Sequence, residues 1–381
     1  MTTRLCRYCI IVYDNEMKQN IFLKIIKYLG SFFLIYKIRN FVRNTFFKPI
    51  FYDVFVQQDK GCVCVIAPYY SLMAFKRSSC IFLINGKRVS IQPVIIDDPE
   101  KNCLVVSYKT NLLLDVNFTY LIKRGKFEIF KGSHVTIEER IKHKLSISTL
   151  FKYEVDFLSE WIEFHLKKGV EHFYLYENNV TPDKRIASVL LPYIEKKIVT
   201  HIMWPYPYHL YNYRFRKFWP YDAYSYNQLP QINHSIYKYG GETEWMINCD
   251  VDEYFYSPKG VDFSEIISDA KGESVASIRI SGFWFGATKI DVEKVKVNGV
   301  VNTFLFSEKE SSSAPKCIFN TDLVQLASVH NAVKFLGKEL NIDSNILRFN
   351  HYRGLGWKKR IDYDFAREIE NKDIIRSRVP L

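Results

Sequence analysis

The chain has 381 residues, of which 48% are hydrophobic and 16% aromatic, so it can bury a large core and is not a disordered protein. Its formal net charge of +12 favours an anionic partner, which can be a nucleic acid, an acidic membrane face or a phosphorylated substrate. The sequence contains no nucleic-acid-binding module, zinc finger or arginine-rich tract, which argues against nucleic-acid binding. The length allows more than one domain, and three segments are predicted: 1–50, 51–140 and 141–381.

The first segment contains an apolar stretch, 21–36, that Lys24 and Lys27 interrupt. At helical spacing these lysines share one face, and further basic residues follow. The pattern predicts a basic amphipathic helix that contacts an anionic membrane through residues 18–43, with a helix packed on the main domain as the alternative. The chain lacks a secretory pattern and a disulfide-like cysteine spacing. We therefore expect a cytoplasmic protein, peripheral at the inner face of the membrane.

Residues 51 to about 131 contain short β-like runs, which turn sequences such as Asn85-Gly86-Lys87 separate. They predict a small antiparallel β-rich module. Its role stays open between glycan binding and bracing the next domain. The runs include 62–66, 80–84, 94–96 and 104–108.

From residue 141 the pattern changes to strands that alternate with helices. Apolar positions at helical spacing, such as Val155, Leu158 and Trp161, predict the helices. The alternation implies βαβ units and an α/β domain with a mostly parallel sheet. The expected strands are 145–151, 172–176, 199–204 and 245–249, and the expected helices are 155–168, 186–195 and 224–239.

The tetrapeptide Asp250-Val251-Asp252-Glu253 follows the last of these strands. In an extended chain Asp250 and Asp252 point to the same side, and ligands of open α/β sheets bind at the carboxyl ends of the strands. Two carboxylates at such a place suit Mg²⁺ or Mn²⁺, whose coordination shell substrate phosphates complete. A D-x-D tripeptide in a solvated loop is the alternative. The preceding strand favours a metal-bound diphosphate, and therefore a nucleotide-sugar enzyme.

Several further motifs accompany the D-x-D in order along the chain. They are Lys152-Tyr153-Glu154, then Glu160-Trp161-Ile162-Glu163-Phe164-His165, then the segment 169–179, and finally Lys316-Cys317-Ile318, Val329-His330 and His351-Tyr352-Arg353. Together with the D-x-D they resemble glycosyltransferase family 92 and related family-2-like transferases, over roughly residues 145–355. The resemblance implies a GT-A fold, to which a preceding β-rich region is suited. It also implies a metal-dependent inverting transfer, with UDP-galactose as the best-known donor.

The resemblance also implies roles for individual positions. Asp252, and Asp250 through water, would hold Mn²⁺ or Mg²⁺ against the diphosphate, and His351 or His330 would supply an imidazole to the metal. The metal would neutralise the charge that develops on the departing UDP. The nucleotide sugar would be bound by residues at the strand ends and by one later lysine: Lys152, Glu154, Glu177, Asn178, Asp250 and Lys316. His165 and His172 are instead expected to be core or helix-end histidines.

An inverting transfer also needs a carboxylate that takes the proton from the acceptor hydroxyl. Glu253, Asp291 and Glu310 are the candidates, with Glu308 beside them, and Trp284 is predicted to stack on the acceptor sugar. Two positions depart from the family pattern, because Tyr153 stands where Asn is usual and Glu177 where Asp is common. The aromatic and basic stretch 205–221 is interpreted as an insertion, either an acceptor- or lipid-facing loop or a plain surface loop.

The resulting hypothesis is a membrane-associated transferase that adds a hexose, galactose in the first instance, to a glycan or glycolipid during surface polysaccharide synthesis. UDP-glucose and UDP-N-acetylglucosamine are the rival donors. A non-catalytic carbohydrate-binding protein with a degenerate transferase fold is the alternative from another class. A nucleic-acid-binding protein, which would show a steep salt dependence, is the third and least favoured.

Overall fold

The structure is a computed structural model that describes residues 50–97, 103–110, 117–136, 141–206, 227–286, 292–311, 313–352 and 369–370. From Phe51 onward these residues belong to one compact unit, which covers 51–209 and 224–381. The predicted helix at 18–43 and all but the first residues of the stretch 205–221 lie outside the described part of the chain. Within that part, no helix is both long enough and apolar enough to cross a membrane.

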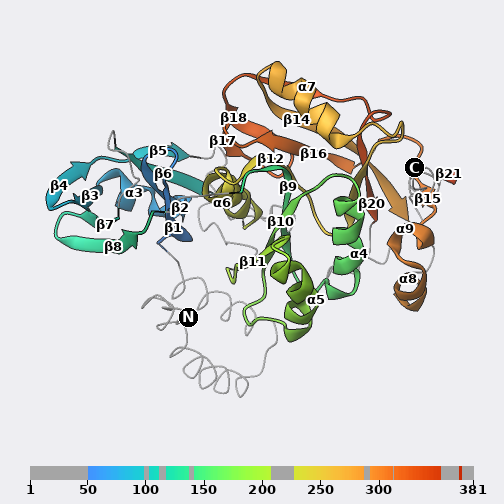
Figure 1. The fold of residues 1–381 in the computed structure, drawn as a ribbon, viewed down its shortest axis with the longest axis horizontal. Coiled ribbons are helices and arrows are strands. Elements are labelled where there is room, and N and C mark those ends of the chain that lie inside the picture. The colour runs from blue at the N-terminus through green and yellow to red at the C-terminus, as the bar shows by residue number, and fades with distance from the viewer. Residues whose placement is uncertain are drawn as a thin grey trace, which may run out of the picture. The chain divides into compact units, whose positions relative to one another are not determined.

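The β-rich region forms two antiparallel sheets of four strands each (blue to green-blue in Figure 1). Its elements are β1 (Asp53–Gln57), β2 (Cys62–Pro68), η1 (Tyr69–Ser71), α3 (Leu72–Lys76), β3 (Ser79–Ile84), β4 (Lys87–Ile91), β5 (Val94–Asp97), β6 (Cys103–Lys109), β7 (Phe118–Arg124) and β8 (Phe127–His134). The strand orders are β1-β2-β6-β5 and β4-β3-β7-β8. Side chains from both sheets, among them Val65, Phe82 and Val106, form one fully buried apolar cluster.

The next elements form the parallel part of a larger sheet of 11 strands, together with its helices. These elements are β9 (His143–Phe151), α4 (Val155–Leu166), β10 (His172–Glu177), α5 (Lys184–Glu195), β11 (Val199–Met203), α6 (Gln228–Tyr239) and β12 (Thr243–Asn248). The strands run parallel in the order β11-β10-β9-β12. The strand–helix alternation in the sequence therefore leads to the expected α/β architecture, and the carboxyl ends of these strands share one edge.

The rest of the sheet is mixed, and its strand pairing was not predicted. Its elements are β13 (Glu253–Tyr256), α7 (Phe263–Gly272), β14 (Val275–Gly286), α8 (Val292–Asn298), α9 (Val300–Thr303), β15 (Phe306–Ser307), β16 (Ser313–Asn320), β19 (Lys338–Asn341), β20 (Arg348–Tyr352) and β21 (Ile369–Glu370), with β17 (Val324–Ala327) and β18 (Ala332–Phe335) as a separate pair. Strand β16 lies antiparallel between β12 and β14. Strand β20 is antiparallel to β13 and parallel to β14.

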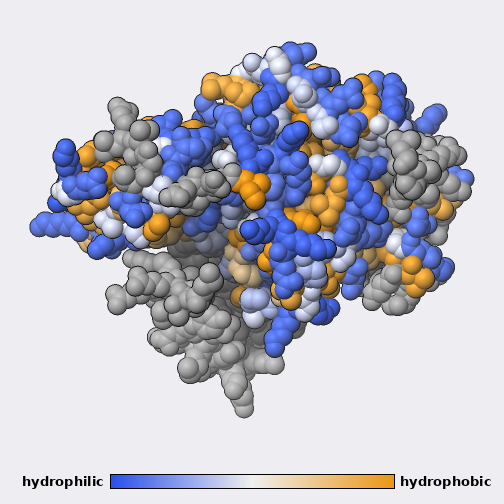
Figure 2. All heavy atoms as spheres, viewed as in Figure 1, coloured by the Kyte–Doolittle hydropathy of each residue, from blue (hydrophilic) through white to orange (hydrophobic). Residues whose placement is uncertain are grey.

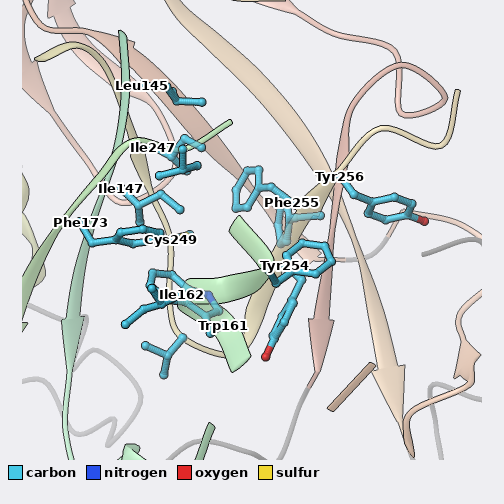
Figure 3. Packing of buried hydrophobic residues seen from close by; sticks show 14 of the residues in the cluster. Leu145, Ile147, Trp161, Ile162, Phe173, Ile247, Cys249, Tyr254, Phe255 and Tyr256 are labelled. Carbon is cyan, nitrogen blue, oxygen red and sulfur yellow. The ribbon is translucent and has the colours of Figure 1, made fainter. Parts of the chain in front are cut away.

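Helix α4 covers one face of the parallel strands, and its apolar stripe supplies much of the core. Trp161 and Ile162 are fully buried and belong to one cluster with Ile147, Ile247 and Cys249 of the sheet (Figure 3). Burial of one such aliphatic or aromatic side chain contributes roughly 1.5–3 kcal/mol. Cys249 is a packed thiol, as expected from its place in an apolar run. This core holds the end of β12, and with it residues 250–253, in place.

Polar side chains cover most of the face of the molecule seen in Figure 2, and apolar ones form small separate groups. Exposed large hydrophobic residues include Tyr153, Val180 and Leu191. Single exposed apolar residues are normal on protein surfaces. Tyr153 differs from the others because its backbone has a φ of 63°, a left-handed conformation that a bulky residue seldom adopts.

Candidate functional site

The D-x-D tripeptide forms a tight turn directly after β12. The amide of Asp250 donates to Oε2 of Glu253 at 2.9 Å, and the amide of Glu253 donates to the carbonyl of Asp250 at 3.1 Å. We call residues 250–253 the acidic turn. Glu253 begins β13, and the indole of Trp161 donates to its carbonyl at 2.9 Å. The turn is therefore held by a side chain of α4, while the Asp250 side chain stays 35% exposed.

Lys316 lies between two carboxylates of the acidic turn. Its Nζ is 3.0 Å from Oδ2 of Asp250 and 3.1 Å from Oε2 of Glu253, and the side chain is almost fully buried. The position follows from strand pairing, because Cys317 on β16 faces Asn248 on β12 and places Lys316 beside the turn. Burial alone would lower the pKa of Lys316, but the two carboxylates have the larger effect, so its pKa is raised above the ordinary value. Lys316 is therefore a fixed cation inside the site.

His351 faces the other half of the acidic turn. Its Nε2 is 3.5 Å from Oδ2 of Asp252, and its Nδ1 is 3.7 Å from Oε1 of Glu253 and 3.1 Å from Oγ of Ser313. The antiparallel pairing of β13 with β20 sets Glu253 opposite His351, and the amide of Tyr352 donates to the carbonyl of Asp252 at 2.8 Å. The structure thus brings Asp252 and His351 together, although 99 positions separate them in the sequence.

The protonation of the site follows from burial and from neighbouring charges. Burial raises the pKa of Glu253 to about 7, although Lys316 acts in the opposite direction. Burial would raise the pKa of Asp252, but the adjacent His351 outweighs it and lowers the pKa. Burial lowers the pKa of His351, but Asp252 outweighs it and raises the pKa. The pair thus favours a carboxylate facing an imidazolium.

Gln228, which the sequence analysis did not single out, also contacts the acidic turn. It is the first residue of α6, and its Nε2 donates to Oδ1 of Asp250 at 3.1 Å. Ser313 was missed as well, although its hydroxyl lies 3.1 Å from His351. Neither residue belongs to a local motif, so only knowledge of the long-range packing would have indicated them.

At the end of β9, adjacent to β12, the segment 152–154 enters α4. The amide of Lys152 donates to Oε2 of Glu154 at 3.2 Å, and Nζ of Lys152 lies 5.1 Å from the ring centre of Tyr153. Tyr153 has a left-handed backbone, which suits the Asn that the family resemblance leads one to expect at this position, since Asn tolerates that conformation better than most side chains. The predicted role of Lys152 and Glu154 in nucleotide binding stays a prediction.

At the end of β10, Glu177 is used for the loop that follows, and Asn178 is used for the segment that follows β11. Glu177 is fully buried, and its carboxylate accepts from Nδ2 of Asn179 at 2.7 Å and from the amide of Asp183 at 2.8 Å, while Nε2 of His201 lies 2.9 Å away. Nδ2 of Asn178 donates to the carbonyls at 204 and 206, at 2.7 and 2.8 Å. Their predicted nucleotide contacts stay predictions beside these structural bonds.

The remaining candidates lie at different depths. His330 is exposed, and its Nδ1 is 2.9 Å from the carbonyl of Pro315. Trp284 on β14 is paired with His351 of β20, which places the predicted acceptor residue next to the site. The amide of Glu308 donates to the carbonyl of Trp284 at 3.0 Å, and Glu310 is exposed. Asp291 lies outside the described residues.

Two histidines that were interpreted as core residues are buried. The ring of His165 accepts from the amide of Phe255 at 3.2 Å, and its other nitrogen lies 2.8 Å from the carbonyl of Trp161. Burial lowers the pKa of His165 to about 3 and that of His172 to about 4. Both rings are therefore neutral structural groups at neutral pH.

Asp252 and His351 fit a divalent cation. Mn²⁺ accepts a carboxylate oxygen and a neutral imidazole nitrogen, so an ion that displaces the proton of the His351 imidazolium could contact both Oδ2 and Nε2, which are 3.5 Å apart. In the ranges that the structure describes, no group of three or more His, Cys, Asp or Glu side chains is arranged to hold a metal ion. A nucleotide diphosphate would therefore have to supply further ligands, as is usual for Mg²⁺-type sites.

The sequence of the chain is similar to that of several known proteins. The family model of Glycosyltransferase family 92 matches residues 142–379, more than half of the chain. The Glycosyltransferase family 92 protein RCOM_0530710 from Ricinus communis is 26% identical over 223 residues, which are 57% of this chain and 36% of that protein. The galactan beta-1,4-galactosyltransferase GALS3 from Arabidopsis thaliana is 25% identical over 208 residues, 51% of this chain and 38% of that protein.

The aligned part thus spans little more than a third of the length of these curated relatives. Among solved structures, S. aureus TarS 1-349 in complex with UDP aligns over 48% of each chain with 11% identity and a TM-score of 0.30, a likeness too weak to support a statement about this chain. The family match covers β9 to β21 and includes the acidic turn, Lys316 and His351. The chain belongs to glycosyltransferase family 92.

Proposed function

We propose that this protein is a metal-dependent inverting glycosyltransferase that transfers a hexose from a UDP-sugar to a glycan or glycolipid acceptor. The observation that carries the proposal is the acidic turn, which presents Asp250 and Asp252 at the carboxyl edge of a parallel sheet within a family 92 domain. Ligands of open α/β sheets bind at this edge. The proposed setting is the synthesis of a surface polysaccharide.

Galactose is the first donor sugar to test. The support is one relative, which is named as a galactan beta-1,4-galactosyltransferase and is 25% identical over 208 residues. UDP-glucose and UDP-N-acetylglucosamine are the rival donors. The cytoplasmic location and the membrane contact through residues 18–43 remain predictions from the sequence.

Each residue of the site has its own role in the proposed reaction. Asp252 and His351 would hold Mn²⁺ or Mg²⁺, which would neutralise negative charge on the departing UDP. Lys316 lets Asp250 and Glu253 lie close together, since its ammonium is about 3 Å from both carboxylates. The position of Asp250 is thereby fixed before the donor binds, and such preorganisation is a general requirement for electrostatic catalysis.

The base that accepts the proton of the acceptor hydroxyl is proposed to be Glu310. Glu253 is only 1% exposed and is held by Lys316 and by the amide of Asp250, so it shapes the turn rather than meeting an acceptor. Glu310 is exposed and follows the segment whose amide at Glu308 bonds the carbonyl of Trp284. An acceptor sugar stacked on Trp284 would therefore lie near Glu310.

The test is calorimetric binding of UDP to the full chain, with and without Mn²⁺, in the wild type and in Asp252→Ala. Asp322→Ala is the matched control, because Asp322 is 56% exposed and its ion pairs with described residues are long, at 3.8 and 3.9 Å. We expect Mn²⁺-dependent binding that Asp252→Ala loses and Asp322→Ala keeps. Equal binding by all three proteins would overturn the metal assignment, and a screen of UDP-sugars with the wild type then tests the transfer itself.

A further inference from the structure

Strand β1 of the β-rich region is joined to helix α6 by a cluster of polar contacts. Oδ2 of Asp53 lies 2.8 Å from Nε2 of His234 and 2.7 Å from Nζ of Lys238. At the other end of β1, Nε2 of Gln57 donates to the carbonyl of Tyr237 at 2.6 Å. These contacts connect residues that are about 180 positions apart in the sequence. We call Asp53, Gln57, His234 and Lys238 the β1–α6 junction.

The β1–α6 junction is ordered by a directed chain of hydrogen bonds. His234 is 1% exposed, and its second ring nitrogen, Nδ1, lies 2.7 Å from the hydroxyl of Tyr176 on β10. Burial would raise the pKa of Asp53, but His234 and Lys238 outweigh it and lower the pKa, so Asp53 is ionised. A carboxylate only accepts, so Nε2–H of His234 donates to Asp53. Burial lowers the pKa of His234, so the ring is neutral and its Nδ1 accepts from the hydroxyl of Tyr176. The orientation of α6 toward β1 is thereby fixed by a buried imidazole, whose partner Asp53 is 28% exposed.

The opposite end of the same helix carries the contact to the acidic turn. Gln228, the first residue of α6, donates to Oδ1 of Asp250 at 3.1 Å. In the middle, Gln231 donates to Oγ of Ser148 at 2.6 Å, and the side chain of Asn233 both donates to and accepts from the backbone of Ala327 at 2.9 Å. Contacts at both ends and in the middle of this 12-residue helix thus connect the β1–α6 junction with the acidic turn.

We propose that Asp53 is a positioning residue for the acidic turn and acts through α6, so that the β-rich region helps to build the site and does not merely precede it. That the turn so positioned is a donor site rests on the proposed function. The alternative is that the β1–α6 junction contributes to stability alone. The two differ in what happens at Asp250 when Asp53 is changed and the fold is kept.

The experiment is hydrogen–deuterium exchange of the full-length chain, followed on peptides that cover β12, the acidic turn and α6. The variant is Asp53→Asn, which keeps the shape of the side chain and removes its charge. Asp97→Asn is the matched control, because Asp97 also links the β-rich region to a later strand, yet its ion pair with Lys334 is long, at 4.0 Å, and both side chains are about half exposed. Gln228→Leu removes the contact at the far end of α6.

We expect Asp53→Asn to speed exchange at the amides of residues 250–253 by roughly 2- to 30-fold, the range of couplings that travel through packed elements. Asp97→Asn should leave those amides unchanged. Gln228→Leu should show the same acceleration at the turn, and Asp53→Asn should add nothing to it in the double variant. Unchanged exchange at the turn in Asp53→Asn, or effects that simply add in the double variant, would overturn the proposal.

Loss of the fold in Asp53→Asn is handled by a second variant. Gln57→Leu removes only the bond to the carbonyl of Tyr237 and keeps the ionic part of the β1–α6 junction. A weaker acceleration at the same amides supports the proposal, and no acceleration in a folded Gln57→Leu contradicts it. Exchange needs no turnover, so its outcome is separate from that of the proposed function. UDP-sugar transfer by the wild type, measured in parallel, tests that function, and a rise in the donor KM of Asp53→Asn at unchanged thermal stability would confirm the role at the donor site.

Discussion

The carboxyl ends of β10 and β12 open onto the same edge of the sheet, and both carry an acidic residue, yet the two ends differ in what their side chains do. After β12, Asp250 and Asp252 are partly exposed and face the cations Lys316 and His351. After β10, Glu177 is fully buried, and its oxygens are used by Asn179, Asp183 and His201. One strand end thus keeps carboxylates that are accessible to a ligand, whereas the carboxylate at the other is used by its loop.

The largest effect on this comparison is expected from Lys316→Met. It leaves the buried Glu253 and the neighbouring Asp250 without their cation, and the loss of one partner of a buried ion pair costs about 3–5 kcal/mol. Unfolding in urea measures the change. Lys338→Met, which breaks the exposed ion pair with Glu273, is the control and should cost less than about 1 kcal/mol. Equal losses in both variants would show that the site does not depend on its internal cation.

The next effect is expected at β10. Glu177→Ala leaves the amide groups of Asn179 and Asp183 without their acceptor, which should lower the free energy of unfolding by about 3 kcal/mol. UDP affinity of the folded protein should stay within about twofold if Glu177 only shapes the loop. A tenfold loss of UDP affinity without a loss of stability would place Glu177 in the nucleotide site and remove the contrast between the two strand ends.

A third prediction concerns pH and the histidine of the Glu160-to-His165 motif. The pKa of His165 is lowered by burial to about 3 in the folded protein, below its ordinary value of 6.5. The unfolded chain therefore binds the extra proton between pH 6.5 and 3, so the folded state loses stability as pH falls through this window and keeps it fully above pH 6.5. The loss from this group at pH 5 is about 2 kcal/mol.

His165→Gln isolates that contribution, because the other groups titrate alike in both proteins. The fall in unfolding free energy from pH 7 to pH 5 should be about 2 kcal/mol smaller in the variant than in the wild type. Chemical denaturation at the two pH values measures it. The same fall in both proteins would mean that the ring is protonated in the folded state, which conflicts with its acceptance of the Phe255 amide.

The smallest effect is expected at the end of β9, between the two strands compared. Tyr153→Asn replaces a bulky residue at a φ of 63° by one that tolerates this backbone, and should stabilise the fold by about 0.5 kcal/mol. Tyr153→Phe keeps the bulk and should change little. A urea midpoint for Tyr153→Asn below that of Tyr153→Phe would indicate that the tyrosine ring has a stabilising contact that outweighs the backbone strain.

The order of the strands and helices was predictable because it depends on local patterns. The apolar runs of β9, β10, β11 and β12 and the helical stripe of α4 are read within a dozen residues each. The arrangement around the acidic turn was less accessible. Lys316 reaches Asp250 because β16 turns back antiparallel to β12, and Gln228 reaches it through the packing of α6. Such pairings join residues far apart in sequence, and no local pattern encodes them.

The family resemblance supplied part of what local patterns could not. It associated His351 or His330 with Asp252 at the metal, and the structure sets the side chains of His351 and Asp252, 99 positions apart, at 3.5 Å. It also proposed Glu177 and Asn178 for the nucleotide, which stays a prediction; in the structure Glu177 bonds the loop after β10 and Asn178 bonds the segment after β11. A sequence motif can contain residues that serve the chemistry and residues that serve the backbone geometry. Only the contacts in the structure distinguish the two kinds.

The carboxylate of Glu160 on α4 has a consequence for the order in which the chain folds. Its Oε2 accepts from the amide of Val300 at 2.8 Å across 140 positions, and a Cβ placed on the neighbouring Gly299 would come within 2.8 Å of Oε1. The first turn of α9 therefore gains its acceptor only after α4 has formed and docked. In refolding, α9 should mature late, and Glu160→Ala, which removes the acceptor, should speed unfolding more than it slows folding, because a contact absent from the transition state acts on the unfolding rate.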